Sequence, residues 1–199
     1  MSLKCTRYEY LVKTEAVIKD IINNDKTIKN DHILEISGNT EQWSKYYKKV
    51  TRVDYPEIDA HNLPYPDNYF DCVAYDQVLE HVKKPWVCVN EAHRVLKPGG
   101  IIIITSPFFY QEHPHPTDYW RFTTDGLAVL VENFSKIIMK EKSGNYKMML
   151  HMIKNPTDRR SKEFQKIQYL PNDKIECIFS GKIISKNAYY VNSTIIAQK

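Results

Sequence analysis

One segment near the middle of the chain holds most of the side chains whose types suit chemistry on a small acceptor. Residues Phe108 to Phe122 read FFYQEHPHPTDYWRF. Two imidazoles in it, His113 and His115, are candidate general bases, because an unperturbed imidazole titrates with a pKa of about 6.5. Three aromatic side chains could wall a ring-shaped or apolar acceptor: Tyr110, Tyr119 and Trp120.

The same segment also has structural interpretations. Arg121 could hold a carboxylate or a phosphate through its planar guanidinium, or it could pair with Asp118 as part of the scaffold. Trp120 and Phe122 could simply lock the segment onto the rest of the fold. A His-x-His pair can bind a metal, but no third histidine or cysteine has ligand-like spacing, so we predict no metal site.

A longer pattern surrounds this segment. Residues 63–71 read LPYPDNYFD, residues 79–81 read LEH and residues 96–100 read LKPGG. This order of motifs resembles the class I S-adenosylmethionine (SAM) dependent methyltransferases, and within them the small-molecule, type 11-like branch. The resemblance covers residues 31 to 135. It implies a SAM cofactor that becomes S-adenosylhomocysteine when its methyl group moves to another molecule.

The resemblance also implies which residues meet the cofactor. Such methyltransferases carry an acid and a glycine-rich turn after the first strand, and here the turn, EISGN, keeps only Gly38. Asp54 would accept hydrogen bonds from the ribose hydroxyls. Asp59 and the Ala60 amide would meet the adenine edge. Each of these positions also fits an ordinary turn. The full set of cofactor candidates is Glu35, Ser37, Gly38, Asp54, Asp59, Ala60, Asp76 and Gln77.

The segment AYDQVLEHV, residues 74–82, opens a helix after a strand. The resemblance places Asp76 and Gln77 on the floor of the methyl-transfer site. Glu80 would brace the turn by hydrogen bonding. His81 is a third candidate base, or a structural histidine packed under the helix.

Methyl transfer from SAM is an in-line displacement, so the protein mainly aligns the reactants and excludes water. A base is needed only where the acceptor loses a proton. We therefore expect transfer to an O or N atom of a small-molecule acceptor. Methyltransferases of this kind usually carry a helix between the ribose-binding acid and the next motif, and only a few residues separate Asp54 from Asp59, so the resemblance implies that this helix is missing or compressed. The glycine-poor turn and this short gap also fit a non-catalytic binding or scaffold protein of the same fold. The lack of Gly-x-Gly-x-x-Gly after Ile36 argues against a nicotinamide-dependent oxidoreductase.

Hydrophobic periodicity predicts the elements that must position these groups. Helices are expected over residues 8–23, 85–96 and 124–134, and strands over 32–36, 49–55, 70–75 and 101–105. In the tail, residues 135–149 predict a strand and a turn. Residues 175–184 and 188–197 predict two strands that form a terminal hairpin.

Strands that alternate with helices indicate a parallel sheet covered on both faces. The predicted fold is α/β, a Rossmann-like, doubly wound, mostly parallel sheet with helices on both faces and a C-terminal antiparallel hairpin. We expect one domain over 1–199, with a cover helix in 1–30, a cofactor-binding core in 31–135 and terminal strands and a loop in 136–199. All cofactor candidates then fall at the carboxyl ends of strands, where such sheets bind ligands.

The composition narrows the expected partners. The net charge of +4, from 28 basic and 24 acidic residues, gives no basic stripe for nucleic acid. The longest aliphatic run, Ile101 to Ile104, is far shorter than the roughly 20 residues of a membrane span. The first residues lack the apolar stretch of a signal peptide, and the cysteines form no CxxC pair, so we expect a cytoplasmic protein. The expected partner is a small-molecule acceptor, with a homodimer left open.

Overall fold

The computed structural model describes residues 9–38, 41–155, 176–179, 182–186 and 190–199. Its centre is a six-stranded sheet in the order β2-β1-β3-β4-β8-β5. The strands in that order are β2 (Lys49–Val53), β1 (His32–Ile36), β3 (Phe70–Asp76), β4 (Leu96–Pro107), β8 (Asn192–Gln198) and β5 (Lys136–Ser143). The first four are parallel to one another, whereas β8 is antiparallel to both β4 and β5.

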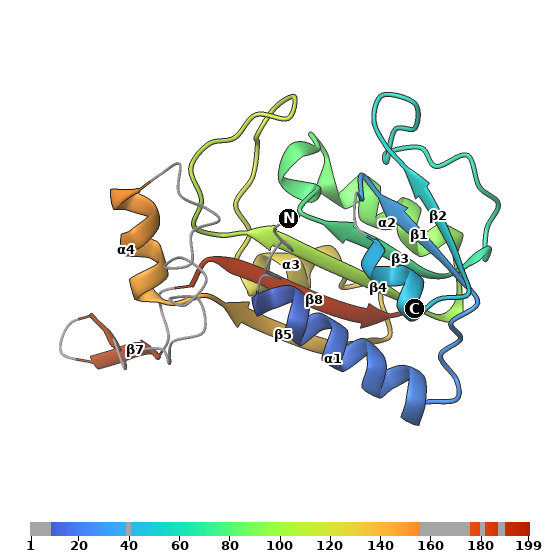
Figure 1. The fold of residues 1–199 in the computed structure, drawn as a ribbon, viewed down its shortest axis with the longest axis horizontal. Helices are drawn as coiled ribbons and strands as arrows, with labels where there is room; N and C mark the ends of the chain where they lie inside the picture. Colours follow the sequence, from blue (N-terminus) through green and yellow to red (C-terminus); the bar gives the residue numbers. More distant parts are fainter. Residues whose placement is uncertain (1–8, 39–40, 156–175, 180–181, 187–189) are drawn as a thin grey trace, which may run out of the picture.

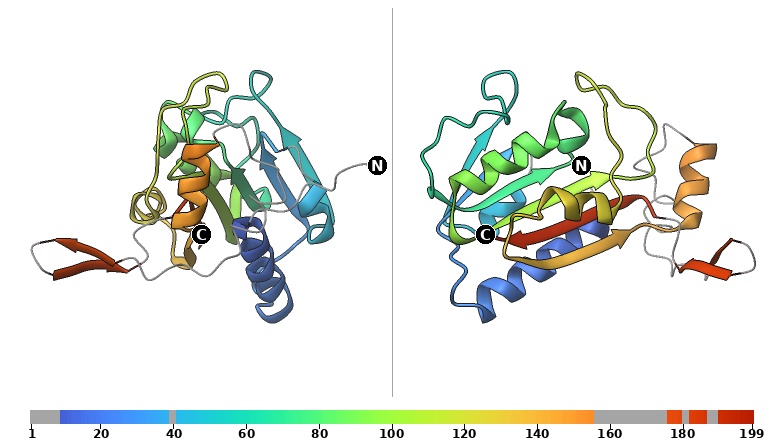
Figure 2. Two further views of the ribbon diagram at one scale, coloured as in Figure 1. Left: turned by 60° about the vertical axis from the view of Figure 1, so that its left-hand side comes forward. Right: turned by 180° about the vertical axis from the view of Figure 1, so that it is seen from behind.

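Helices cover both faces of the sheet (Figure 1, Figure 2). The helices are α1 (Glu9–Asn24), α2 (Pro85–Val95), α3 (Thr124–Leu130) and α4 (Tyr146–Lys154), with the short 3-10 turns η1 (Glu41–Lys45) and η2 (Leu79–His81). Helix α4 lies beyond the end of the sheet (Figure 1). Helix α1 lies on one face, and α2 and α3 lie on the other (Figure 2). The predicted doubly wound α/β fold is confirmed.

Alternate residues of the central strands feed two separate apolar cores. Ile102 and Ile104 of β4 pack with α2 and α3, whereas Ile101 and Ile103 pack with α1 and with Trp43 of η1. All four isoleucines are fully buried. A strand buried on both faces reads as a continuous β-branched run, which is why this segment predicts a central strand.

The register brings the carboxyl ends of the parallel strands to one edge of the sheet. Ile36 of β1 lies opposite both Val53 of β2 and Tyr75 of β3, and Asp76 lies opposite Thr105 of β4. The loops after β2 and β4 rise together from this edge, in teal and yellow-green in Figure 1. We call it the carboxyl edge below.

Three details differ from the sequence prediction. Residues 146–154 form α4, not a turn, because the Asn145 side chain accepts a hydrogen bond from the Met148 amide (2.9 Å) and caps a helix. The antiparallel hairpin is present as β6 (Glu176–Phe179) with β7 (Lys182–Lys186), whereas the last strand, β8, lies between β4 and β5. Helix α3 also ends at Leu130, earlier than expected.

Cys72 and Cys88 are free thiols buried in the core, and Cys5 lies outside the described residues. Within the described ranges, no helix is both long and apolar enough to cross a bilayer.

His32 at the start of β1 makes the stability of this sheet depend on pH. Burial lowers the pKa of His32, whose Nε2 lies 2.8 Å from Thr51 Oγ1. The folded state therefore binds a proton less readily than the unfolded chain, so stability is intact above a pH of about 6.5 and falls as the pH is lowered below it. We expect the His32→Gln variant to lose less stability than the wild type between pH 7.5 and 5. Urea unfolding across this range measures the difference, and equal slopes would contradict it.

Candidate functional site

The turn after β1 is built around a buried carboxylate. Glu35 is fully buried and its Oε2 accepts a hydrogen bond from Arg52 Nε (2.8 Å). A Cβ at Gly38 would lie only 1.9 Å from the Glu35 side chain, so position 38 has room for glycine alone. Ser37 has a φ of 53°, in the left-handed region that favours glycine. Ser37 thus keeps a backbone conformation typical of glycine, although the sequence keeps only Gly38 of the glycine-rich turn.

Asp54 lies beside this turn, at the end of β2. The Ser37 amide donates to the Val53 carbonyl (2.6 Å), which holds the ends of β1 and β2 together. The Asp54 carboxylate is exposed, and its Oδ1 accepts from the Tyr55 amide (2.9 Å). A carboxylate therefore faces solvent next to the turn, as the ribose assignment requires.

The loop from 54 to 69 contains no helix or strand, as the short gap after Asp54 predicted. In it, Asp59 Oδ1 lies 2.9 Å from the His61 amide and 2.6 Å from His61 Nδ1. These hydrogen bonds lower the pKa of Asp59. Both contacts end on Oδ1, so Oδ2 stays available to a donor such as an adenine amine. Ala60 is buried in the core beneath.

Thr105 of β4 organises the end of β3. Its hydroxyl donates to Asp76 Oδ1 and accepts from Gln77 Nε2 (3.1 Å), while the Gln77 amide donates to the Thr105 carbonyl (3.1 Å). Gln77 has a φ of 57°, so the chain turns sharply here. Asp76 and Gln77 are thereby held side by side at the carboxyl edge. Sequence reasoning missed Thr105, because it belongs to a strand 28 residues away from Gln77.

Glu80 is a buried carboxyl group in η2. Its side chain is 0% exposed, and burial raises its pKa to about 8. Oε2 accepts from Ser106 Oγ (3.3 Å), whereas Oε1 has no hydrogen-bond partner among the described residues. The Glu80 carbonyl accepts from the Tyr119 amide (2.7 Å), so the prediction that this residue braces the turn is supported through its backbone.

Two of the three candidate bases lie together. The rings of His81 and His113 are 4.8 Å apart, and the more exposed His115 ring lies 6.4 Å from His81. His81 Nδ1 lies 2.8 Å from the Thr117 carbonyl oxygen, which can only accept, so Nδ1 donates and the lone pair of the neutral ring is on Nε2. Burial lowers the pKa of His113, so it is biased towards its neutral form.

Arg121 is engaged within its own loop. Its Nη1 and Nη2 lie 2.5 and 2.7 Å from the two Asp118 oxygens. This pair lowers the pKa of Asp118 and raises that of Arg121. Of the two interpretations from sequence, the structure shows the contacts of the scaffold pair.

The aromatic candidates line the opening of this loop. Tyr110 packs edge-on against His113, with ring centroids 4.8 Å apart. Tyr119 is 47% exposed and Trp120 36% exposed. Trp120 also donates from Nε1 to the Val82 carbonyl (2.9 Å) and stacks on the buried Phe122, so it locks the loop while one face stays exposed.

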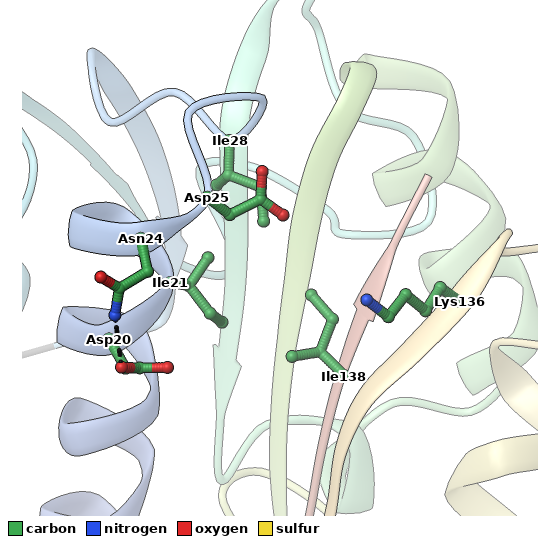
Figure 3. A pocket seen from close by; sticks show the side chains of 7 residues that line it. All are labelled: Asp20, Ile21, Asn24, Asp25, Ile28, Lys136 and Ile138. Carbon is green, nitrogen blue, oxygen red and sulfur yellow. Dashed lines mark hydrogen bonds between the residues drawn. The ribbon is translucent and has the colours of Figure 1, made fainter.

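A cavity of about 360 Å³ lies at the other end of the molecule, between α1 and β5 (Figure 3). Lys136 of β5 lines it, and the register pairs Lys136 with Gln198 and Gln198 with Ile101 at the start of the buried part of β4. The cavity therefore opens at the amino ends of the parallel strands. Because open α/β sheets bind ligands at the opposite edge, we place the candidate site at the carboxyl edge.

The sequence of this chain is similar to that of known methyltransferases. Residues 29–104 match the family described as "Methyltransferase domain". The chain is 34% identical over 90 residues to the ubiquinone/menaquinone biosynthesis C-methyltransferase of Nitrosospira multiformis, and 40% identical over 55 residues to that of Yersinia enterocolitica. These alignments cover 45% and 28% of the chain. The chain covers only 32% and 22% of those two relatives.

Solved structures extend the similarity in fold to nearly the whole chain. A phosphoethanolamine N-methyltransferase of Haemonchus contortus, in complex with S-adenosylhomocysteine, matches with a TM-score of 0.54 at 15% identity, over 94% of this chain and 52% of that one. The [4+2]-cyclase SpnF also matches with a TM-score of 0.54, at 16% identity, over 98% of this chain and 84% of that one. A shared fold therefore does not by itself determine the reaction.

The turn after β1 yields a prediction about stability. Ser37→Gly removes a left-handed serine and should stabilise the protein by about 1 kcal/mol. Gly38→Ala forces a Cβ into Glu35 and should destabilise it by about 1–3 kcal/mol. Urea unfolding of the purified variants measures both effects.

Gly126→Ala in α3 is the matched control, because a Cβ there meets only ordinary contacts, the nearest at 3.4 Å. It should be neutral or stabilising, since alanine favours helices. A Gly38→Ala variant as stable as this control would disprove the steric role of Glu35.

Proposed function

Since this chain contains a class I SAM-dependent methyltransferase domain, matched over residues 29–104, we propose that it transfers the methyl group of SAM to a small-molecule acceptor. The observation that carries the proposal is the convergence of the polar candidates at one edge of the sheet. The Ser37–Gly38 turn follows β1, Asp54 follows β2, and Asp76 ends β3. SAM supplies a methyl group on a cationic sulfonium, which is a good leaving group.

The side chains at this edge fit such a molecule. Asp54 offers an exposed carboxylate for the ribose diol, and Asp59 Oδ2 with the Ala60 amide offers an acceptor and a donor for the adenine. Asp76 and Gln77, held by Thr105, form the floor of the site. Carboxylates gathered at one edge favour a ligand with a cationic sulfonium and ammonium. Glu35 contributes indirectly, because its side chain shapes the Ser37–Gly38 turn.

The acceptor is proposed to lie under the loop of residues 108–122 and to be methylated at an O or N atom. Tyr110, Tyr119 and Trp120 form its walls, and His81, His113 and His115 are the candidate bases for an acceptor that loses a proton. His81 has the geometry for this role because its Nε2 keeps a lone pair. The relatives named above are C-methyltransferases, so carbon acceptors belong in any screen.

A second function, as a non-catalytic binding or scaffold protein, is favoured by one observation. The segment from Asp54 to Tyr69 has no helix or strand to support the adenine and ribose side of the site. Titration with SAM and S-adenosylhomocysteine separates the two functions. Micromolar binding of both supports the enzyme, whereas a folded protein that binds neither at millimolar concentration is the scaffold.

The adenine assignment predicts the effect of one substitution. Asp59→Ala should weaken SAM binding by about 1–3 kcal/mol, because it removes an acceptor from the adenine amine. Calorimetric titration measures the change. Asp31→Ala is the control, since Asp31 precedes β1 at the opposite edge and pairs with Lys48 on the surface. Equal affinities for the two variants would reject the role of Asp59.

The acceptor assignment predicts a separation of binding from turnover. His113→Ala and His115→Ala should leave SAM affinity unchanged and lower the rate of methyl transfer by about 10²–10⁴-fold if the residue is the base. Transfer from labelled SAM to a panel of phenols, amines and activated carbon acids measures the rate. A loss of SAM binding would instead assign the residue to the cofactor side.

A further inference from the structure

Three side chains beside the proposed acceptor site converge on one point. One ligand atom from each of Glu80, His81 and His113 lies within 4.8 Å of the other two. Glu80 Oε1 and His81 Nε2 are 3.7 Å apart. Glu80 and His81 come from η2, and His113 comes from the loop after β4, so the fold and not the local sequence brings them together.

Hydrogen bonds engage Nδ1 of both histidine rings, which leaves Nε2 as the nitrogen that each ring can offer to a ligand. His81 Nδ1 is held by the Thr117 carbonyl (2.8 Å), and His113 Nδ1 lies 3.0 Å from Asp118 Oδ2 and 3.1 Å from the Gln111 carbonyl oxygen. All three partners accept, so each Nδ1 carries its proton and each Nε2 keeps its lone pair. Histidines that bind metals are oriented in this way, by a carbonyl or a carboxylate on the other ring nitrogen.

Asp118 is itself held in place. Arg121 contacts both of its oxygens, and the His113 amide donates to Oδ2 (2.9 Å). The orientation of the His113 ring therefore rests on a fixed carboxylate. This arrangement explains why Arg121 pairs with Asp118 within the loop.

The carboxylate of Glu80 supplies an independent observation. The side chain is fully buried, yet Oε1 has no hydrogen-bond partner among the described residues. A buried oxygen without a partner costs about 1–3 kcal/mol, so native structures rarely keep one without a ligand or a function. This oxygen is the atom that faces His81 Nε2.

We propose that Glu80, His81 and His113 bind a divalent transition metal ion of the zinc type. Two imidazole nitrogens and one carboxylate oxygen are a common ligand set for catalytic zinc and leave a coordination position open. Tetrahedral bonds of about 2.0–2.1 Å place ligand atoms about 3.3 Å apart. Glu80 Oε1 and His81 Nε2 are already close to this separation at 3.7 Å, and the three ligand atoms, which lie within 4.8 Å of one another, must draw together when an ion binds. The sequence prediction of no metal site considered only His-x-His spacing, and this proposal departs from it.

The metal site is a separate proposal from methyl transfer, but it changes which histidines can act as a base in that reaction. A bound ion occupies the Nε2 lone pairs, so His81 and His113 cease to be bases while it is present. The open coordination position then lies beside the walls of the acceptor site, where it suits an acceptor oxygen. His115, 6.4 Å from His81 by ring centroids, remains as the histidine base.

The test is metal binding by the purified chain, without SAM. Protein treated with a chelator is titrated with Zn²⁺ by calorimetry and with Co²⁺ by visible absorption, which reports the coordination geometry. We expect one ion per chain with a Kd below about 10 μM, and Co²⁺ bands of a four- or five-coordinate site. A Kd above 100 μM for a folded protein would overturn the proposal.

Variants identify the ligands. Glu80→Gln, His81→Ala and His113→Ala should each weaken binding by at least 100-fold, and Asp118→Asn by about 10–100-fold, because it only orients His113. His115→Ala is the matched control from the same loop and should bind as the wild type does. Circular dichroism checks that each variant folds. If Glu80→Gln does not fold, His113→Ala still tests the proposal, because the His113 side chain is partly exposed.

Two outcomes separate this proposal from the proposed function. Binding that survives all three ligand substitutions, or that disappears in His115→Ala, refutes this ligand set whatever the protein does with SAM. Binding of Zn²⁺ by a chain that fails to bind SAM supports the metal site and leaves the scaffold function in place.

Discussion

The burial of the sheet on both faces is the constraint on which the rest of the structure depends. With α1 on one face and α2 and α3 on the other, the central strands have no surface on which to display polar side chains. Chemistry is therefore confined to the strand ends. Because the ends of β1, β2, β3 and β4 are aligned, the polar residues at those ends form a row along the carboxyl edge.

Several polar groups at this edge are buried, and each burial has a structural consequence. Removing a carboxylate from water is costly unless it is paired or hydrogen-bonded. Glu35 is compensated by Arg52, and it shapes the turn at Gly38. Asp118 is compensated by Arg121. Among the described residues, Glu80 has a hydrogen-bond partner at only one of its two oxygens, and this imbalance sets the cluster of Glu80, His81 and His113 apart from the other polar contacts.

The two departures from the methyltransferase pattern differ in how much they change the candidate site. The serine at position 37 keeps the left-handed backbone, so the turn tolerates the loss of a glycine at a modest cost. The missing helix between Asp54 and Asp59 is a larger change, because a loop alone presents Asp59 and Ala60. That loop is nevertheless tied to α2, since the Lys84 amide donates to His61 Nε2 (3.2 Å) and the Leu63 amide to Glu91 Oε2 (2.9 Å).

The sequence by itself determined the elements and the motifs, because periodicity and turn chemistry act over a few residues. The β-branched run at Ile101 to Ile104 indicated a central strand, and the LPYPDNYFD, LEH and LKPGG motifs indicated the family. Only the tertiary structure decided which side chains meet. Thr105 bonds to Gln77 across 28 residues, and His81 to the Thr117 carbonyl across 36. Such contacts depend on strand register and on the path of one loop, which local spacing does not encode. The approach of His113 to Glu80 follows from that path, whereas Arg121 and Asp118 are only three residues apart and their pairing was one of the two interpretations from sequence.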